Sequence, residues 1–295
     1  MSPAAIALVL AAAVAHASWN LFGKQAAETG AAFFVWLLAV CAGTIYLPVV
    51  VVTVIVTRPH LTGMNWLFLA GTGLLHGGYF LFLQLGYRLG DLSLAYPIGR
   101  GTGALLAALA GIVLLGERPS ALGYAGIVAI VAGVVLIGLP ARTPRLADAV
   151  ALAAPVAGAV GFALVTGLFI GCYTIWDKYA VANLHTQPVL QGCAGFPVMA
   201  LMFTPVVLRD RPRLAKVWHE FRPQVLGAAV LSPLAYILVL VALSFTAVSA
   251  IAPAREVSVL FGVLLGRRLL GEDSLGRRLA AAAAIVAGII AVAIA

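Results

Sequence analysis

The stretch SLAYPIGRGTGALLAALAGIVLLG, residues 93–116, contains one charged residue, Arg100. About 20 apolar residues at 1.5 Å per residue cross the hydrocarbon core of a bilayer, so the stretch predicts a transmembrane helix. An arginine inside such a helix costs at least roughly 2.5–3.5 kcal/mol unless it finds water or a partner. The stretch therefore predicts both a membrane-spanning fold and a partner for Arg100.

Composition supports a polytopic membrane protein over the whole chain. Of 295 residues, 63% are hydrophobic and 9% are charged, and the mean hydropathy is +1.09. Soluble domains carry about 25% charged residues, which excludes a soluble globule. The first apolar run has a polar interior and lacks a signal-peptide cleavage pattern, so we expect it to stay as a helix. Ten apolar runs predict ten transmembrane helices, at residues 3–23, 31–56, 64–87, 93–115, 120–139, 152–176, 188–208, 224–245, 248–269 and 276–295.

The basic residues lie mostly between these runs. The formal net charge is +8, but lysines and arginines in short loops set membrane topology and do not indicate nucleic-acid binding. Apart from Arg100 and Arg255, 13 of the 18 basic residues fall in odd-numbered loops and three in even-numbered ones. The positive-inside rule would place both termini outside the cell.

The chain contains an internal repeat. A shift of 155 positions places Arg100 on Arg255, residues 114–117 (LLGE) on 269–272 (LLGE), and residues 129–133 (AIVAG) on 284–288 (AIVAG). The expected domains are a first repeat at 1–139, a linker at 140–151 and a second repeat at 152–295. Five spans in each repeat invert the second relative to the first, which is a recurrent plan of secondary transporters.

Each repeat has an arginine at the entrance of a small-residue helix face. At 100° per residue, Arg100, Gly103, Ala107 and Gly111 share one narrow face, and Arg255, Ser258, Gly262 and Gly266 repeat it. Small residues let helices approach closely in lipid. We therefore expect close packing along both faces.

Glu256 is the one acidic residue well inside a predicted span, and it is the expected partner of Arg100. Two readings follow. The two arginines with one glutamate leave a net positive charge that suits capture of a carboxylate or phosphonate. Alternatively, Arg100 and Glu256 form a structural lock between the repeats.

Two further helices carry polar arcs that must face protein or a wet cavity. Residues 16–24 (HASWNLFGK) place His16, Trp19, Asn20 and Lys24 on one arc, and residues 76–87 (HGGYFLFLQLGY) do so with His76, Tyr79, Gln84 and Tyr87. The histidines suit either proton relay or packing against neighbouring helices. Tyr96 and Tyr236 are expected to shape the same cavity.

Other polar residues have simpler interpretations. Lys24, Asp177 and Lys178 near span ends are interpreted as loop charges, and Trp19, Trp176 and Tyr87 suit either a cavity or the interfacial aromatic belt. Glu117 and Glu272 follow a glycine between helices, where an acidic residue favours a helix N-terminus. Cys41, Cys172 and Cys193 match no metal or disulfide spacing. No cofactor or catalytic motif is present, so no cofactor and no enzymatic activity are expected.

The residues HASWNLFGKQA (16–26), DLSLAYPIGRGTGALLAALAGIVLLGERPSALGYAGIVAIVAGVVLIG (91–138) and APAREVSVLFGVLLGRRLLGE (252–272) resemble the EamA-type branch of the drug/metabolite transporter superfamily. The resemblance covers essentially the whole chain as two repeats. It implies ten helices in a basket, with helices one, three, four, six, eight and nine around a cavity, and export or exchange of small metabolites without ATP. It also implies cytoplasmic termini, opposite to the loop charges. The first span lacks the glutamate of small multidrug-resistance relatives, so proton-coupled export of cations is not implied.

We therefore predict an all-α secondary transporter of the cell (inner) membrane that moves a small polar or anionic metabolite, such as an amino acid, by alternating access. The alternatives are an exporter of cationic or aromatic drugs, with Glu256 as charge partner, and, from another class, a membrane-embedded enzyme or a non-transporting partner subunit. The expected partners are a small-molecule substrate and the lipid bilayer, with or without a coupling proton, and no nucleic acid is expected. The expected substrate-binding residues are Arg100, Arg255, Glu256, His16, Trp19, Asn20, His76, Tyr79, Gln84, Tyr96 and Tyr236.

Overall fold

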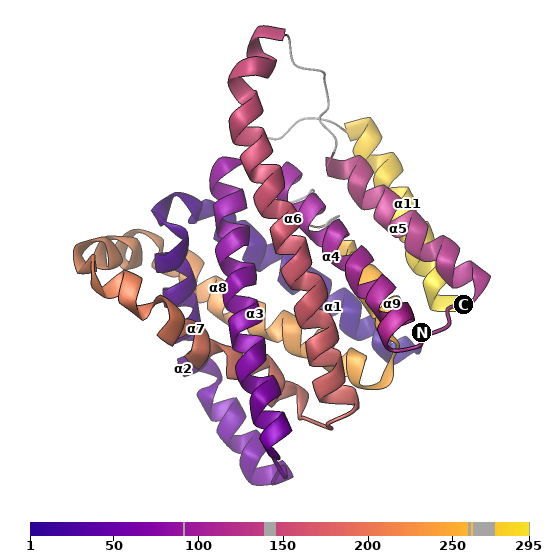
Figure 1. The fold of residues 1–295 in the computed structure, drawn as a ribbon, viewed down its shortest axis with the longest axis horizontal. Helices are drawn as coiled ribbons and strands as arrows, with labels where there is room; N and C mark the ends of the chain where they lie inside the picture. The colour runs from indigo at the N-terminus through magenta and orange to yellow at the C-terminus, as the bar shows by residue number, and fades with distance from the viewer. Residues whose placement is uncertain (91, 139–145, 259–260, 262–274, 295) are drawn as a thin grey trace.

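The computed structural model describes residues 1–90, 92–138, 146–258, 261 and 275–294, and these contain helices and no strands (Figure 1). Residues 146–151 of the expected linker are helical, because α6 begins at Leu146. The elements are α1 (Pro3–Gln25), η1 (Ala27–Thr29), α2 (Ala31–Thr57), α3 (Gly63–Leu89), α4 (Leu92–Leu114), α5 (Ala121–Gly138), α6 (Leu146–Ala182), α7 (Pro188–Leu208), α8 (Arg211–Phe245), α9 (Val248–Ala254) and α11 (Leu275–Ile294).

Six helices in the described part of the chain are long and apolar enough to cross a bilayer: α1, α2, α3, α7, α8 and the segment Ala157–Ala182 of α6. Helices also occupy the fourth, fifth and tenth predicted spans, whereas the ninth is described only in part. The outer surface is strongly apolar, and Val56, Val113 and Leu201 are each about three-quarters exposed. Soluble monomers rarely expose such continuous apolar surface. The chain is an integral, multi-pass membrane protein.

Helices of the two repeats interleave instead of forming two separate bundles. The most extensive contacts join α4 to α6, α5 to α11, α1 to α8, α3 to α6 and α2 to α7. Exchanging each helix for its counterpart in the other repeat turns α1–α8 into α6–α3 and leaves α2–α7 and α5–α11 unchanged. These four contacts thus follow a pseudo-twofold relation between the repeats, whereas the counterpart of α4–α6 involves the ninth span, which is described only in part.

The α5–α11 pair shows this relation at single residues, and Figure 1 shows the two helices side by side. A Cβ atom on Gly126 would lie 2.7 Å from the carbonyl oxygen of Gly288, and one on Gly133 would lie 2.8 Å from that of Ala281. A shift of 155 positions takes Gly126 to Ala281 and Gly133 to Gly288, so each contact is the equivalent of the other in the repeat. Glycine at these positions lets the two backbones touch, which a side chain would prevent.

The small-residue face of α4 packs closely, as expected, and its main partner is α6. A Cβ atom on Gly103 would lie 2.5 Å from Cβ of Ile170, and one on Gly167 would lie 2.6 Å from Cβ of Thr102. Farther along, Gly111 is close to Val248 at the start of α9. The matching face at Gly262 and Gly266 lies outside the described residues.

The helix containing Arg255 is interrupted at the arginine. α9 ends at Ala254, and residues 255 and 256 form a turn in which Ser258 N donates to Arg255 O at 3.1 Å. Pro253, which has no backbone N–H, lies two residues before the break. The equivalent helix of the first repeat is not interrupted, because α4 continues past Pro97 and Arg100 from Leu92 to Leu114.

Lys24 and Lys178 are not simple loop charges. Lys24 Nζ donates to the carbonyl oxygens of Tyr87 and Gly90 at 2.8 and 3.0 Å, at the C-terminus of α3. Lys178 Nζ donates to those of Leu243 and Thr246 at 2.8 and 2.9 Å, at the C-terminus of α8. Both lysines satisfy carbonyl groups that a helix end leaves free, and they do so at equivalent places in the two repeats.

Glu117 also has a structural role, but at an unexpected helix. Its carboxylate accepts from the backbone N–H groups of Val248 and Ser249 at 2.8 Å each, so it caps α9, far along the chain. We had expected it to favour the helix that directly follows it. The repeated Glu272 lies outside the described residues.

We predict that Lys178→Met lowers the free energy of unfolding by about 1–3 kcal/mol, because two carbonyl groups lose a charged donor. Thermal or denaturant unfolding in detergent micelles measures the change. The matched control is Lys216→Met, whose side chain is 71% exposed and should unfold like the wild type. Equal stability of all three proteins would contradict the capping role.

Candidate functional site

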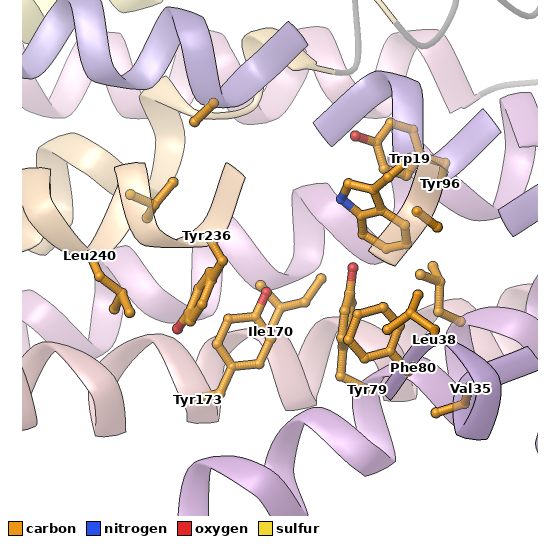
Figure 2. Close-up of a cluster of buried hydrophobic side chains, with 14 of the residues drawn as sticks. Trp19, Val35, Leu38, Tyr79, Phe80, Tyr96, Ile170, Tyr173, Tyr236 and Leu240 are labelled. Carbon is orange, nitrogen blue, oxygen red and sulfur yellow. The ribbon is translucent and has the colours of Figure 1, made fainter. Parts of the chain in front are cut away.

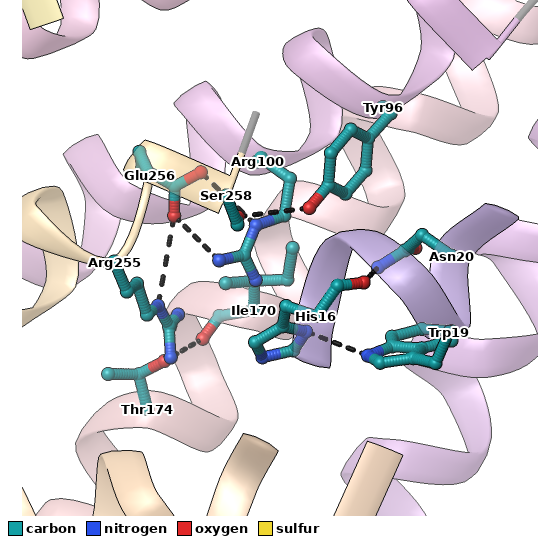
Figure 3. A network of polar contacts seen from close by, with 10 residues as sticks. All are labelled: His16, Trp19, Asn20, Tyr96, Arg100, Ile170, Thr174, Arg255, Glu256 and Ser258. Carbon is teal, nitrogen blue, oxygen red and sulfur yellow. Dashed lines mark hydrogen bonds and ion pairs between the residues drawn. The ribbon is translucent and has the colours of Figure 1, made fainter. Parts of the chain in front are cut away.

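Arg100 and Glu256 form a buried ion pair between the two repeats (Figure 3). Arg100 Nε donates to Glu256 Oε2 at 3.1 Å, and Arg100 Nη2 lies 3.0 Å from Oε1. The side chains are 1% and 0% exposed. The contact was expected from the sequence, and the break after α9 helps to present the carboxylate to α4.

Arg255 approaches the same carboxylate from the other side. Its Nε lies 3.7 Å from Glu256 Oε1, and its Nη2 donates to Thr174 Oγ1 at 3.0 Å. Its guanidinium carbon lies 5.9 Å from the ring centre of Tyr173. One carboxylate therefore lies between two guanidinium groups.

The two arginines retain donors without a partner. Arg100 Nη1 and Arg255 Nη1 are buried and make no hydrogen bond to any described residue. His16 Nε2 is in the same situation, and the charges of both arginines act on this ring. Buried donors without partners are rare and costly, so this group is equipped to receive acceptor atoms.

A narrow aromatic cavity lies next to the charged group, with about 30 Å³ of free space. Figure 2 shows part of its aromatic wall around Trp19, Tyr79 and Tyr236. His76 stacks on Tyr173 with ring centres 4.2 Å apart, and its ring lies 4.8 Å from that of Tyr236. A volume of this size holds a water molecule but not a metabolite. The cavity as it stands in this structure is therefore too narrow for a metabolite.

The polar arcs of α1 and α3 meet, as the sequence predicts. Trp19 Nε1 donates to His16 Nδ1 at 2.8 Å, and Tyr87 Oη donates to Asn20 Oδ1 at 2.6 Å. Trp19 and Tyr87 are fully buried, so neither belongs to an interfacial belt. Gln84 is buried, and neither its amide oxygen nor its amide nitrogen has a hydrogen-bond partner among the described residues.

Asp177 is fully buried, so its interpretation as a loop charge is wrong. Its Oδ2 accepts from Thr72 Oγ1 at 3.0 Å and also from Tyr236 Oη. Its Oδ1 accepts from Gln191 Nε2 at 2.7 Å. The misinterpretation arose because its span was predicted to end at residue 176, whereas α6 continues to Ala182.

The eleven predicted residues thus fall into three neighbouring groups. His16, Trp19, His76, Tyr79 and Tyr236 line the cavity. Arg100, Arg255 and Glu256 form the charged group, which Tyr96 supports through its 3.0 Å hydrogen bond to Ser258 Oγ. Asn20 and Gln84 lie elsewhere between α1 and α3 and do not line the cavity.

Sequence reasoning missed Tyr173, Thr174 and Asp177 as site residues. A shift of 154 places Trp19-Asn20 on Tyr173-Thr174 and Lys24 on Lys178. This second register differs from the first by one residue. It would have identified Tyr173 and Thr174 as the α6 counterparts of the polar residues Trp19 and Asn20.

Comparison with known proteins agrees with this architecture. The model of the EamA-like transporter family matches residues 3–139 and 157–294. No curated protein matches the chain. Among solved structures 24 chains match, and one described as "Crystal structure of protein" has a TM-score of 0.71 and 15% identity, covering 100% of this chain and 98% of that one. At this identity the likeness concerns the fold alone.

A two-repeat, all-helical membrane fold with a charged centre beside a cavity defines a class, that of polytopic membrane transporters. Within that class the chain belongs to the EamA-like transporter family, of the drug/metabolite transporter superfamily.

We predict that Glu256→Leu lowers the free energy of unfolding by about 3–5 kcal/mol, because it leaves Arg100 buried without its counter-charge. The double variant Arg100→Leu with Glu256→Leu should be more stable than Glu256→Leu alone, since it removes both charges. Denaturant unfolding of the two single variants and the double variant measures the coupling. Strictly additive effects would mean that the ion pair contributes no interaction energy.

Proposed function

We propose that this protein is a secondary active transporter of a small polar or anionic metabolite, such as an amino acid or a related carboxylate. Substrate would bind where the charged group meets the aromatic cavity. Arg100 and Arg255 would attract and orient the carboxylate, while His16, His76, Tyr79 and Tyr236 would surround the rest of the molecule. Glu256 would hold the two guanidinium groups in place when substrate is absent.

The observation that carries this proposal is the charge and donor balance of the buried group. Two guanidinium groups share one carboxylate, which leaves one net positive charge and donors without partners at Nη1 of each arginine. A planar guanidinium binds a carboxylate through two parallel hydrogen bonds. A purely structural lock would need no second arginine.

Alternating access is the mechanism that fits the narrow cavity. Helices α1, α3, α6, α7 and α8 contribute its walls, so residues of both repeats surround it. Rocking one repeat against the other would widen it toward one side and then the other. The break at Arg255 would let part of the ninth span move separately from α9.

We further propose ten transmembrane helices in two inverted repeats, in the cell (inner) membrane, with export or exchange as the direction of transport. The reciprocal contacts of α5 with α11 and of α1–α8 with α3–α6 support the inversion. The proposed division is that expected from the sequence, 1–139, a linker at 140–151 and 152–295, with the last six linker residues forming the start of α6.

A second candidate is export of aromatic or cationic compounds. The observation favouring it is the aromatic wall, in which Trp19, Tyr79, Tyr173 and Tyr236 surround the cavity. Aromatic faces bind organic cations. Because Glu256 is already paired with Arg100, Asp177 would be the better charge partner for such a cation.

A ligand-stabilisation screen of the purified protein distinguishes the two candidates. We expect amino acids and small carboxylates to raise the unfolding temperature, and organic cations to leave it unchanged, because a ligand of the folded state adds to its stability. Counterflow of the stabilising compounds in proteoliposomes then tests for transport. Stabilisation by organic cations alone would favour the second candidate.

We predict that Arg255→Met weakens carboxylate binding by about 10- to 100-fold while the protein remains folded, because one charge-assisted interaction is lost. Thr174→Val is the matched control, since it removes the hydrogen-bond partner of Arg255 and keeps its charge. Unchanged binding by Arg255→Met would remove this residue from the site.

Arg100→Ala should abolish counterflow while folded protein stays in the membrane, as judged by size-exclusion chromatography of the extracted variant. If the protein is lost instead, the Arg100→Leu, Glu256→Leu double variant resolves the question. A folded double variant that still transports would show that the pair is a lock only.

A further inference from the structure

Asp177 is a buried carboxyl group that the proposed substrate site does not use. It is 0% exposed, and its hydrogen-bond partners come from three other helices: Thr72 on α3, Gln191 on α7 and Tyr236 on α8. All three partners line the cavity, whereas Asp177 itself lies directly behind them. A change at the Asp177 carboxyl group would therefore reach each of these three cavity-lining residues through one hydrogen bond.

No cation is bonded to Asp177 in the described part of the chain. Its neighbour Lys178 is turned away to the end of α8, and Arg255, in the turn after α9, acts on Asp177 through its charge without an ion pair. The other titratable groups around it are Tyr236 on α8, which donates to it, Tyr173 on α6, and His76 on α3, whose Nδ1 lies 3.0 Å from Thr72 Oγ1. A carboxylate held only by neutral donors at full burial is costly, and binding a proton removes that cost.

Resting on the transport function proposed above, we propose that Asp177 is the proton-binding site of this transporter, and that its proton is taken up together with an anionic substrate. One proton from water converts the carboxylate to the neutral acid, and its release to water on the other side restores the carboxylate.

Gln191 provides the structural response to protonation. In the present arrangement its Nε2 donates to Asp177 Oδ1 and, at 3.2 Å, to Phe68 O, while its Oε1 is buried without a partner among the described residues. A proton on Oδ1 needs an acceptor, which Oε1 supplies when the amide turns over, since its two ends have nearly the same shape. The turn gives up the bond to Phe68 O, which keeps its hydrogen bond from Trp176 Nε1. After the turn, the amide N–H donors of Gln191 occupy the position that its Oε1 held before.

The charges also link the proton to the substrate. With Asp177 ionised, the four buried charges of Arg100, Arg255, Glu256 and Asp177 sum to zero; with Asp177 neutral they sum to +1. An anion is therefore bound more favourably when Asp177 carries its proton, and by reciprocity the anion favours the proton. A carrier with this linkage transports the anion and the proton together. Export or exchange of the metabolite would therefore move a proton in the same direction as the anion.

The position of Asp177 gives the proton a short path to water. Five residues separate it from the end of α6 at Ala182, which is about 8 Å at 1.5 Å per residue. Gln191 lies three residues from the start of α7 at Pro188. The group is thus much closer to one membrane surface than to the other.

The first experiment tests proton binding without any substrate. Infrared difference spectra of the lipid-reconstituted protein, titrated from alkaline to acidic pH, should contain a protonated-carboxyl absorption that is missing from Asp177→Asn. Glu220→Gln, which removes an exposed carboxyl group, is the matched control and should keep the absorption. An unchanged absorption in Asp177→Asn would overturn the proposal, whether or not transport is found. Gln191→Leu should shift the frequency of the absorption, because it removes one partner.

The second experiment tests the linkage, using a radiolabelled mixture of L-amino acids with succinate in proteoliposomes. Uptake by the wild type should rise as pH falls, by at most about tenfold per pH unit for one linked proton, and a pH gradient should drive accumulation. Asp177→Asn, a neutral mimic, should retain counterflow at equal pH but lose both pH dependence and gradient-driven accumulation.

The outcomes separate the two proposals. Gradient-driven accumulation by Asp177→Asn, a sodium requirement, or weaker uptake at low pH would each overturn proton coupling at Asp177 while leaving the transport function intact. Loss of counterflow by folded Asp177→Asn would assign this residue to substrate binding instead. If the wild type moves none of the labelled compounds, the proposed function fails, and with it the coupling; the infrared titration would then assign Asp177 as a proton site alone.

Discussion

The cost of burying charge in a hydrocarbon-like interior is the constraint on which this structure depends. Arg100 and Glu256 come from different repeats and are both almost completely buried, so each needs the other. Their contact fixes α4 against the broken ninth span at the centre of the molecule. Arg255 and Thr174 extend the same contact to α6. Opposite charges in this group hold the two repeats together, so a charged substrate that binds nearby would act directly on the contact between them.

The interleaving of the repeats gives this group its surroundings. Because α1 packs on α8 and α3 packs on α6, the cavity wall combines side chains from both repeats. Close contacts at Gly103, between α4 and α6, and at Gly126, between α5 and α11, join the two repeats in the same way, since packing drives helix association in lipid. The contacts that stabilise the fold therefore cross the same boundary at which a transporter must move. Hydrogen bonds from Lys24 and Lys178 to helix ends belong to this framework and not to the site.

Much of the site could be predicted because polar residues in an apolar sequence have few explanations. The arc of His16 and Trp19, the arc of His76 and Tyr79, and the pairing of Arg100 with Glu256 all follow from helical periodicity and the cost of unpaired charge. Asp177 could not be assigned in this way. It lies close to a predicted span end, where an exposed loop carboxylate and a buried one have the same sequence surroundings, and only the positions of Thr72, Gln191 and Tyr236 distinguish them.

The sequence by itself determined the membrane class, the helical content and the two-repeat plan, because hydropathy, helical period and a fixed shift between identical blocks are properties of the chain alone. The tertiary structure decided which helices meet, where the helix of Arg255 breaks, and which polar groups share a cavity. These depend on distances between residues far apart in the chain: Glu117 caps α9, and Asp177 receives hydrogen bonds from three helices. No local pattern encodes such pairings, because each is selected by packing and by the requirement that buried polar groups find partners.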